Sequence, residues 1–326
     1  VGGKSAPRRS LPCSSLAPCL ATASLTRRAY SDADVSSSVT SISPPRCAAR
    51  VSVPRWPSTA AASLPCMFAP VGRRDYDEDR IRGSQSLLHV LNRAGVGVLW
   101  RDNQSGCKGV CDRVSQWATQ TLKVPELCQD GECFDEIMLQ ELPKQLSLLD
   151  PAKRAKGTVV VMHQMGSHGP AYYKRTPQAF KAFKPECQSS ALQNCPVDQI
   201  ANAYDNSVLY ADHVVSKTVK WLQAQSRPTA LMYLSDHGES LGEKGLYLHG
   251  MPYRMAPREQ THVPMVAWLS KPMQQQRGWR MACLQAQADK PWSHDNLFHS
   301  MLDLAQVSTQ LAKPELNIFG ACAAGR

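Results

Sequence analysis

The chain has 326 residues and 43% hydrophobic residues, which is enough for one large hydrophobic core. Its net charge is +10, but residues 1–65 alone carry +6 of it, with eight Lys and Arg against two Asp. Because no basic stripe with interleaved aromatic residues occurs, we expect no nucleic-acid partner, although attraction to an anionic lipid surface fits the charge. No apolar run reaches eighteen residues, so the sequence contains no predicted membrane-spanning helix.

Residues 1–62 differ from the rest of the chain. Residues 1–65 contain fourteen serines but no Glu or Phe, and their apolar residues follow neither a helical nor a strand period. Three interpretations stay open: a disordered basic segment, a targeting peptide, or a translated frameshift that covers residues 3 to about 60. We expect the frameshift, and we assign residues 1–62 to an anomalous segment and residues 63–326 to one globular domain.

From residue 63 onward, apolar patterns predict alternating helices and strands. Helices are predicted over residues 84–93, 134–149, 197–225 and 295–304, and strands over residues 96–100, 157–162, 230–234 and 264–269. Residues 107–133 are predicted to form an irregular loop. This alternation indicates an α/β fold, with a mainly parallel central sheet covered by helices on both faces.

Histidines follow two of the predicted strands. Residues 230–234 lead into Asp236, His237 and Gly238, where glycine allows the backbone to turn, and His249 follows in a glycine-rich loop. An isolated Asp-His pair could be a turn with a solvated histidine. However, the strand at residues 157–162 also runs into histidine, and in open α/β sheets ligands bind at that edge.

Imidazole and carboxylate groups that meet at one sheet edge suit zinc or a similar divalent ion. The strand over residues 96–100 should bring residues 101–108 to the same edge as the histidines. The sequence therefore predicts a metal site there.

Two long segments carry a family resemblance: HQMGSHGPAYYKRTP over residues 163–177 and SDHGESLGEKGLYLHGMP over residues 235–252. Shorter matches are SLPCMF, LWRDN and AYDN. Together they resemble the phosphoethanolamine–lipid A transferases, which include the mobile colistin-resistance enzymes and belong to the alkaline phosphatase and sulfatase superfamily. The resemblance covers about residues 63–326. It implies transfer of phosphoethanolamine from phosphatidylethanolamine to lipid A through a covalent phospho-enzyme at a Zn²⁺ site.

The resemblance also assigns roles to individual residues. Asp236 and His237 match two zinc ligands of the family. His168 and His249 match histidines of the phosphate pocket, where they would bind a second zinc or protonate the leaving group. Lys108 matches a phosphate-contacting residue, with a solvated surface lysine as the alternative. We expect three further residues to be structural, either as supports for the ligands or as a helix start: His163, Glu239 and Glu243.

Two parts of the family's site are missing from this sequence. The nucleophilic threonine is absent on either alignment that we can draw, with Pro57 at its place in one of them; Ser58 and Thr59 are the only hydroxyl groups near enough to replace it. Gly3 stands where the family has a zinc-ligating Glu. We therefore expect little or no transferase activity from this polypeptide. A sulfatase or phosphodiesterase of the same superfamily and a catalytically dead lipid-binding relic are the alternative functions.

Twelve cysteines without Cys-x-x-Cys spacing indicate an oxidising compartment. Short polar loops between them favour the disulfides Cys128–Cys133 and Cys187–Cys195, which have counterparts in the family. Less strongly indicated pairs are Cys107–Cys111 and Cys283–Cys322. The family's partner for Cys66 is missing here, which leaves Cys66 unpaired or bonded to Cys47.

The resemblance also implies a location. The family carries a transmembrane domain ahead of its catalytic domain, and this chain begins with Val1. We therefore expect a piece of a longer protein, a monomer anchored in the bacterial inner membrane with its catalytic domain in the periplasm.

Overall fold

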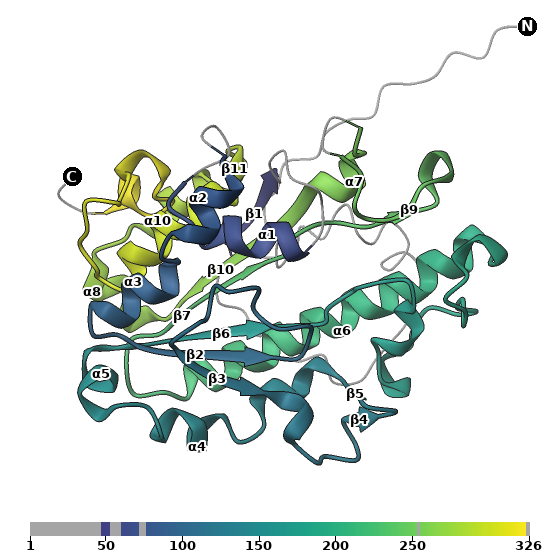
Figure 1. Cartoon of the computed structure of the whole chain (residues 1–326), viewed down its shortest axis with the longest axis horizontal. Coiled ribbons are helices and arrows are strands. Elements are labelled where there is room, and N and C mark those ends of the chain that lie inside the picture. Colours follow the sequence, from purple (N-terminus) through teal and green to yellow (C-terminus); the bar gives the residue numbers. More distant parts are fainter. Residues whose placement is uncertain (1–46, 53–59, 72–75, 253–254, 324–326) are drawn as a thin grey trace, which may run out of the picture. The chain divides into compact units, whose positions relative to one another are not determined.

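The computed structural model describes residues 47–52, 60–71, 76–252 and 255–323, which belong to the compact unit Cys47–Arg326 (Figure 1). Most of the anomalous segment, including Ser58 and Thr59, lies outside these residues. Two of its stretches are described: strand β1 (Cys47–Ser52) and the start of helix α1 (Ala60–Met67).

Two sheets form the centre of the described unit. The first has the order β11-β1-β10-β7, and its other strands are β7 (Ala230–Leu234), β10 (His262–Leu269) and β11 (Trp292–Ser293). In it, β10 runs antiparallel to both β1 and β7, while β11 is parallel to β1. The second sheet is wholly parallel and has the order β3-β2-β6, with β2 (Gly97–Asp102), β3 (Ser115–Ala118) and β6 (Thr158–His163).

Strand β2 shows why helices cover both faces of the parallel sheet. Its Val98 and Trp100 pack into a core that also contains side chains of α3 (Leu87–Arg93) and α10 (Asp295–Leu304). Leu99 points the other way, into a core with Leu142 and Trp221. Successive strand residues face opposite sides, so a strand covered on both sides is apolar throughout. The predicted α/β fold class is confirmed, with β10 as its antiparallel member.

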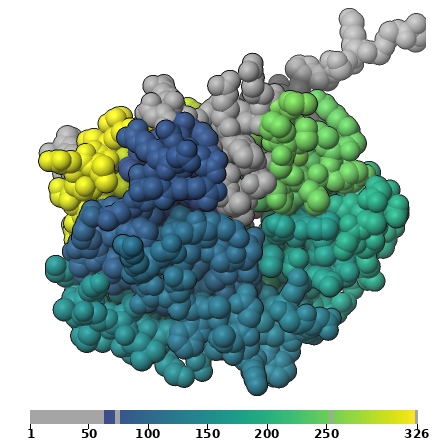
Figure 2. Space-filling model, in the orientation of Figure 1, coloured from purple at the N-terminus to yellow at the C-terminus, as the bar shows by residue number. Residues whose placement is uncertain are grey.

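Four predicted elements were placed within a few residues. Helix α6 (Val197–Gln223) and helix α10 follow their predicted spans closely, as do strands β7 and β6. Among the described residues, no helix is both long and apolar enough to cross a membrane. In the space-filling view, the dark blue region of α2 (Glu78–Gly83) and α3 lies directly against the lighter blue segment that follows it (Figure 2).

The helix predicted over residues 134–149 is wrong. The structure has a 3₁₀ helix at Asp135–Leu139 and a separate helix α4 (Leu142–Ser147). Between them Glu141 takes a left-handed conformation with φ 54°, and Pro143 then occupies the first turn of α4, where its missing N–H costs nothing. Because the helix is interrupted here, the carbonyl of Gln140 has no helical partner, and it accepts a hydrogen bond from Arg101 Nη2 at 3.0 Å.

The segment predicted as an irregular loop is partly ordered into strands. It contains β3 and the hairpin strands β4 (Cys128–Gln129) and β5 (Glu132–Cys133). The remaining helices are α5 (Pro151–Lys156), α7 (Arg258–Thr261), α8 (Lys271–Arg277) and α9 (Met281–Ala286). Strands β8 (Ser240–Leu241) and β9 (Tyr247–Leu248) form a further small hairpin. Short 3₁₀ helices lie at Thr119–Thr121, Tyr172–Lys174, Gln178–Phe180, Leu192–Asn194, Glu243–Gly245, Pro314–Leu316 and Gly320–Cys322.

The structure contains all four disulfides that the spacing suggested: Cys107–Cys111, Cys128–Cys133, Cys187–Cys195 and Cys283–Cys322. Cys66 is a free, half-buried thiol, and burial raises its pKa to about 12. The side chain of Cys47 lies outside the described part of the structure.

Candidate metal centre

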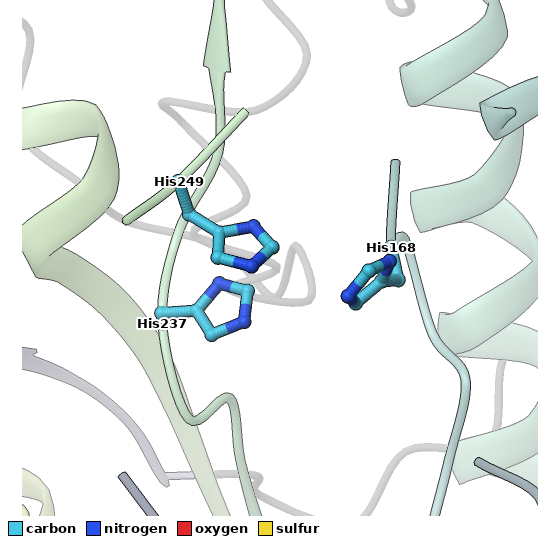
Figure 3. Close-up of side chains that lie close together, drawn as sticks. All are labelled: His168, His237 and His249. Atoms are coloured by element: carbon cyan, nitrogen blue, oxygen red, sulfur yellow. The ribbon is translucent and has the colours of Figure 1, made fainter. Parts of the chain in front are cut away.

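Three histidines from two segments of the chain lie close together. His237 follows β7, His249 follows β9, and His168 belongs to the loop after β6. Each offers a ring nitrogen within 4.8 Å of the other two. His237 and His249 are stacked with their ring centres 3.8 Å apart, and His168 faces them from a separate segment (Figure 3). The tertiary structure thus brings together three of the histidines that the sequence placed at strand ends.

In each of these histidines, Nδ1 lies at hydrogen-bond distance from an oxygen that can only accept. The pairs are His168 with the carbonyl of Gly169 (2.6 Å), His237 with the carbonyl of Gly238 (3.0 Å) and His249 with the carboxylate of Glu239 (3.0 Å). Nδ1 therefore carries the hydrogen, and in the neutral ring Nε2 keeps a free lone pair. Such outer hydrogen bonds are typical of metal-binding histidines because they fix both tautomer and ring orientation.

Asp236 adds an oxygen to this set of nitrogens. One of its carboxylate oxygens lies 3.6 Å from Nε2 of His237, and its side chain is about a quarter exposed. Nitrogen and carboxylate oxygen donors at one point are the ligands that zinc prefers. The three clustered histidines therefore fit a zinc ion, with the Asp236 carboxylate near one of them, His237.

The charge state of His168 agrees with a cation site. Burial lowers the pKa of His168, and the nearby rings of His249 and His237 lower it further, although the Gly169 carbonyl and Glu239 act in the opposite direction. The neutral ring, which is the form that can bind a metal, is therefore favoured.

Glu239 connects the two sides of the cluster. Its buried carboxylate accepts hydrogen bonds from His249 Nδ1 at 3.0 Å, from the hydroxyl of Tyr172 at 3.0 Å and from the backbone N–H of Gly169 at 3.4 Å. Burial and this carboxylate both raise the pKa of Tyr172, so the hydroxyl remains a donor. Sequence reasoning gave Glu239 a structural role without saying what it supports. The signal available was its place two residues after His237.

Gly238 is required for a reason other than a turn. A Cβ atom there would lie 1.9 Å from the carbonyl oxygen of Glu259, which no side chain could tolerate. The N–H of Gly238 also donates to the carbonyl of Gln260 at 3.1 Å. The segment that carries His237 is thus packed backbone to backbone against α7.

Two buried contacts hold the loop that carries His168. The carboxylate of Asp135 accepts hydrogen bonds from the backbone N–H groups of Met165 at 2.8 Å and Gly166 at 2.7 Å. The guanidinium of Arg175 donates to the carbonyl of His168 at 3.0 Å. The Asp135 contact could not be predicted from the sequence, because Asp135 lies 30 residues before Met165.

His163 does not join the cluster. Its Nδ1 donates to the carboxylate of Asp102 at 2.6 Å, and its ring lies beside Trp100 with the ring centres 5.3 Å apart. This agrees with the structural role expected for it. Glu243 begins the 3₁₀ helix Glu243–Gly245 and accepts a hydrogen bond from the N–H of Leu241.

Lys108 lies on the loop after β2. Its ammonium donates to the carbonyl of Ser105 at 2.7 Å and to the hydroxyl of Ser105 at 3.0 Å. It borders a cavity of about 140 Å³ whose lining includes none of the three clustered histidines. The other lining residues are Pro65, Ala69, Ile81, Arg82, Ser84, Gln85, Ser86, Gly109 and Val110. A contact between Lys108 and a phosphate therefore stays a prediction.

Comparisons with known proteins show the family of the chain. A family model described as Sulfatase matches residues 57–307. The chain is 46% identical over 269 residues to phosphoethanolamine transferase EptA of Salmonella typhimurium, covering 81% of this chain and 48% of that protein. It is 42% identical over 221 residues to phosphatidylethanolamine transferase Mcr-2 of Escherichia coli, covering 65% of this chain and 40% of that protein.

Solved structures give the same result. The soluble domain of lipooligosaccharide phosphoethanolamine transferase A from Neisseria meningitidis superposes with a TM-score of 0.80 at 39% identity, covering 85% of this chain and 82% of that one. The same Neisseria protein, solved as an integral membrane protein, also gives 0.80 at 40% identity; there the match covers 85% of this chain and 52% of that one. The chain spans about half the length of the curated relatives it matches.

Proposed function

Because the chain belongs to the phosphoethanolamine transferases of the sulfatase family, we propose that it moves phosphoethanolamine from phosphatidylethanolamine to lipid A at a zinc site, through a covalent phospho-enzyme. The names of its relatives support the donor lipid and a lipooligosaccharide acceptor. We further propose a monomer whose catalytic domain lies in the bacterial periplasm, held at the inner membrane by an upstream domain. The relative solved as an integral membrane protein supports that location.

One observation carries the proposal. Ring nitrogens of His168, His237 and His249 lie within 4.8 Å of one another, each Nδ1 has its own oxygen acceptor, and the Asp236 carboxylate lies 3.6 Å from Nε2 of His237. Such a site can hold a cation and receive the anionic oxygens of a phosphodiester.

Each residue would have a definite task. Asp236 and His237 would hold the zinc ion, which when bound lowers the pKa of the attacking hydroxyl and neutralises phosphate charge. His168 and His249 would line the phosphoryl pocket, and one of them, once its Nε2 has taken up a proton, would contact a phosphoryl oxygen and give that proton to the departing diacylglycerol oxygen. Lys108 would contribute a further positive charge to the phosphate.

The nucleophile would be a hydroxyl group of Ser58 or Thr59. Its oxygen would form a bond to phosphorus while the bond from phosphorus to the diacylglycerol oxygen breaks. In the second half of the reaction an oxygen of lipid A would attack phosphorus and release the hydroxyl. Since this sequence lacks the family's threonine and has Gly3 in place of a zinc-ligating Glu, we propose that the polypeptide as written is impaired.

The decisive experiment compares this polypeptide with a repaired version. The repaired chain would replace the anomalous segment by family-type segments that supply the Glu and the Thr. Both would be given a fluorescent phosphatidylethanolamine analogue and lipid A, and the products would be identified by mass spectrometry. We expect transfer by the repaired chain, its loss in the Asp236→Asn variant, and little or none by the chain as written.

Each result decides one part of the proposal. Wild-type-like turnover by the chain as written would refute the impairment. Hydrolysis without transfer by the repaired chain would instead indicate the phosphodiesterase alternative. A repaired chain that binds zinc but forms no trapped phospho-enzyme would favour the lipid-binding relic. Reading the gene in all frames tests the frameshift independently, because a shifted frame must yield a Gly-Glu-Thr-type segment.

A further inference from the structure

A second pair of side chains, which the proposed reaction does not use, lies at the carboxyl end of the parallel sheet. Asp102 ends β2 and His163 ends β6, and the parallel register of these strands places them directly opposite one another. His163 Nδ1 donates to Asp102 Oδ1 at 2.6 Å, and only about a tenth of each side chain is exposed. Strand pairing alone does not require a buried carboxylate with a strong hydrogen-bond partner at this position.

The two oxygens of Asp102 have different partners. Oδ1 accepts from His163 and, at 3.2 Å, from Nε1 of Trp100. Oδ2 accepts from the backbone N–H groups of Gly106 at 2.9 Å and Gln104 at 3.3 Å. The carboxylate therefore joins the rigid end of two strands to the loop that follows β2.

That loop determines where the Lys108 ammonium lies. The ammonium is bound by the carbonyl and hydroxyl of Ser105, the residue immediately before the Gly106 that Asp102 holds. On the other side, the disulfide Cys107–Cys111 closes the chain around Lys108, whose φ of 51° is uncommon for a residue with a side chain. A shift at Gly106 would therefore be transmitted to Ser105 and the ammonium.

The ionised form of Asp102 is the form that this arrangement needs. Burial alone would raise the pKa of Asp102, but the hydrogen bonds from His163, Gly106 and Trp100 and the positive potential of His163 together hold it below its usual value. Without the donor at His163, a mostly buried carboxylate would lose its strongest partner and turn or protonate.

We propose that Asp102 and His163 form a positioning pair, in which the imidazole fixes the carboxylate and the carboxylate fixes the loop that presents Lys108. The link from Lys108 to the phosphoryl group rests on the function proposed above, whereas the positioning itself does not. His163 acts here through one specific atom, Nδ1. A purely space-filling histidine would depend on its shape and not on which nitrogen donates.

Two substitutions at His163 separate these possibilities. In His163→Asn the amide nitrogen can occupy the position of Nδ1, while in His163→Gln it reaches toward that of Nε2. Asp102→Asn removes the carboxylate itself. All would be made in the full chain, and circular dichroism would show whether each is folded.

The first measurement reports how firmly the loop after β2 is held. We expect hydrogen exchange at the Gly106 amide and acylation of Lys108 by a small succinimidyl ester to rise about tenfold in His163→Gln and Asp102→Asn, the effect of losing one hydrogen bond to a charged group. His163→Asn should stay within about threefold of the wild type for the same reason. The exposed Lys144, acylated in the same samples, serves as the internal control.

The second readout is binding of phosphoethanolamine, measured by calorimetric titration beside Lys108→Ala. We expect His163→Gln to weaken binding in the same direction as Lys108→Ala, with zinc affinity unchanged. If His163→Asn and His163→Gln show equal hydrogen exchange at Gly106 and equal acylation of Lys108, the positioning role is wrong. If His163→Gln does not fold, the test is Asp102→Asn: exchange and acylation rates equal to those of the wild type would then overturn the positioning role. If the loop responds but Lys108→Ala binds phosphoethanolamine normally, the positioning stands and the proposed phosphate role of Lys108 fails.

Discussion

The loops after β6 and β7 look alike in sequence, but their first histidines have different environments. His163 ends β6 and turns its Nδ1 toward Asp102 on the neighbouring strand. His237 follows β7 and gives its Nδ1 to the carbonyl of Gly238, which leaves Nε2 beside Asp236. The same side chain after a strand is thus a support in one loop and a potential ligand in the other. The two histidines differ in the acceptor that their Nδ1 contacts: the Asp102 carboxylate for His163 and the Gly238 carbonyl for His237.

The two loops also differ in what holds them. The β6 loop contributes His168 to the cluster, and it is held by Asp135, by Arg175 and, through the N–H of Gly169, by Glu239 of the β7 loop. The β7 loop supplies His237 and His249 and carries its own anchor, Glu239. Changes in the β7 loop should therefore damage the proposed zinc site more than changes in the β6 loop.

The largest expected effect tests the two histidines directly. Replacing His237 by Gln removes a ligand, so zinc affinity should fall more than about 100-fold, beyond the loss typical of an outer partner. His163→Asn should bind zinc as the wild type does. Competition titration with a fluorescent chelator measures both. Equal zinc affinities in the two variants would contradict the assignment of roles.

The next largest loss of zinc affinity is expected for Glu239→Gln. The Gln side chain has one acceptor oxygen in place of two and no charge, so it cannot accept from His249, Gly169 and Tyr172 as the carboxylate does; the His249 ring is held less firmly, and zinc affinity should fall about 10–100-fold. The control in the same loop is Glu243→Gln, because Glu243 is exposed and contacts no histidine ligand in the structure. The same chelator titration applies. A loss at Glu243 equal to that at Glu239 would mean that loop folding, not ligand orientation, is being measured.

The Asp102–His163 pair should appear in the pH dependence of stability. The pKa of Asp102 is lower in the folded state than in the unfolded state, so its contribution is present above the unfolded value of about 3.9 and is lost as pH falls through the folded value. At pH 7, Asp102→Asn should reduce the free energy of unfolding by about 2 kcal/mol. Urea unfolding at several pH values measures this, and the difference should shrink toward pH 3. A difference that is constant with pH would exclude the ionised carboxylate as its cause.

The smallest effect is expected at the outer anchor of the β6 loop. Arg175 also pairs with Glu132 at 3.1 Å, but the Glu132 side chain is 46% exposed. Glu132→Gln should therefore change the free energy of unfolding by less than about 0.5 kcal/mol, as for most exposed ion pairs. Urea unfolding at neutral pH measures it, with zinc affinity unchanged. A weaker zinc site in this variant would show that the β6 loop depends on its surface contacts more than its buried ones.

Local patterns in the sequence were sufficient for some elements and not for others. The strand at residues 230–234 and the helix at residues 295–304 were predicted within their observed bounds, because their apolar patterns are strong. The predicted helix over residues 134–149 failed at Glu141, whose backbone conformation no periodicity reveals. Strand β3 was missed because its four residues, Ser115–Ala118, are largely exposed and have no apolar pattern.

The sequence by itself determined the α/β class and the two strands that lead into the loops of His168 and His237. Hydrophobic periodicity is local, and it dictates which segments become strands and which loops share an edge. Only the tertiary structure showed which groups these two structural residues contact: His163 bonds to Asp102, and Glu239 bonds to His249 and Gly169. Those outcomes depend on register: Asp102 faces His163 across 61 residues of chain, and Glu239 reaches Gly169 across 70. Hydrogen-bond partners so far apart are set by how strands and loops pack against one another.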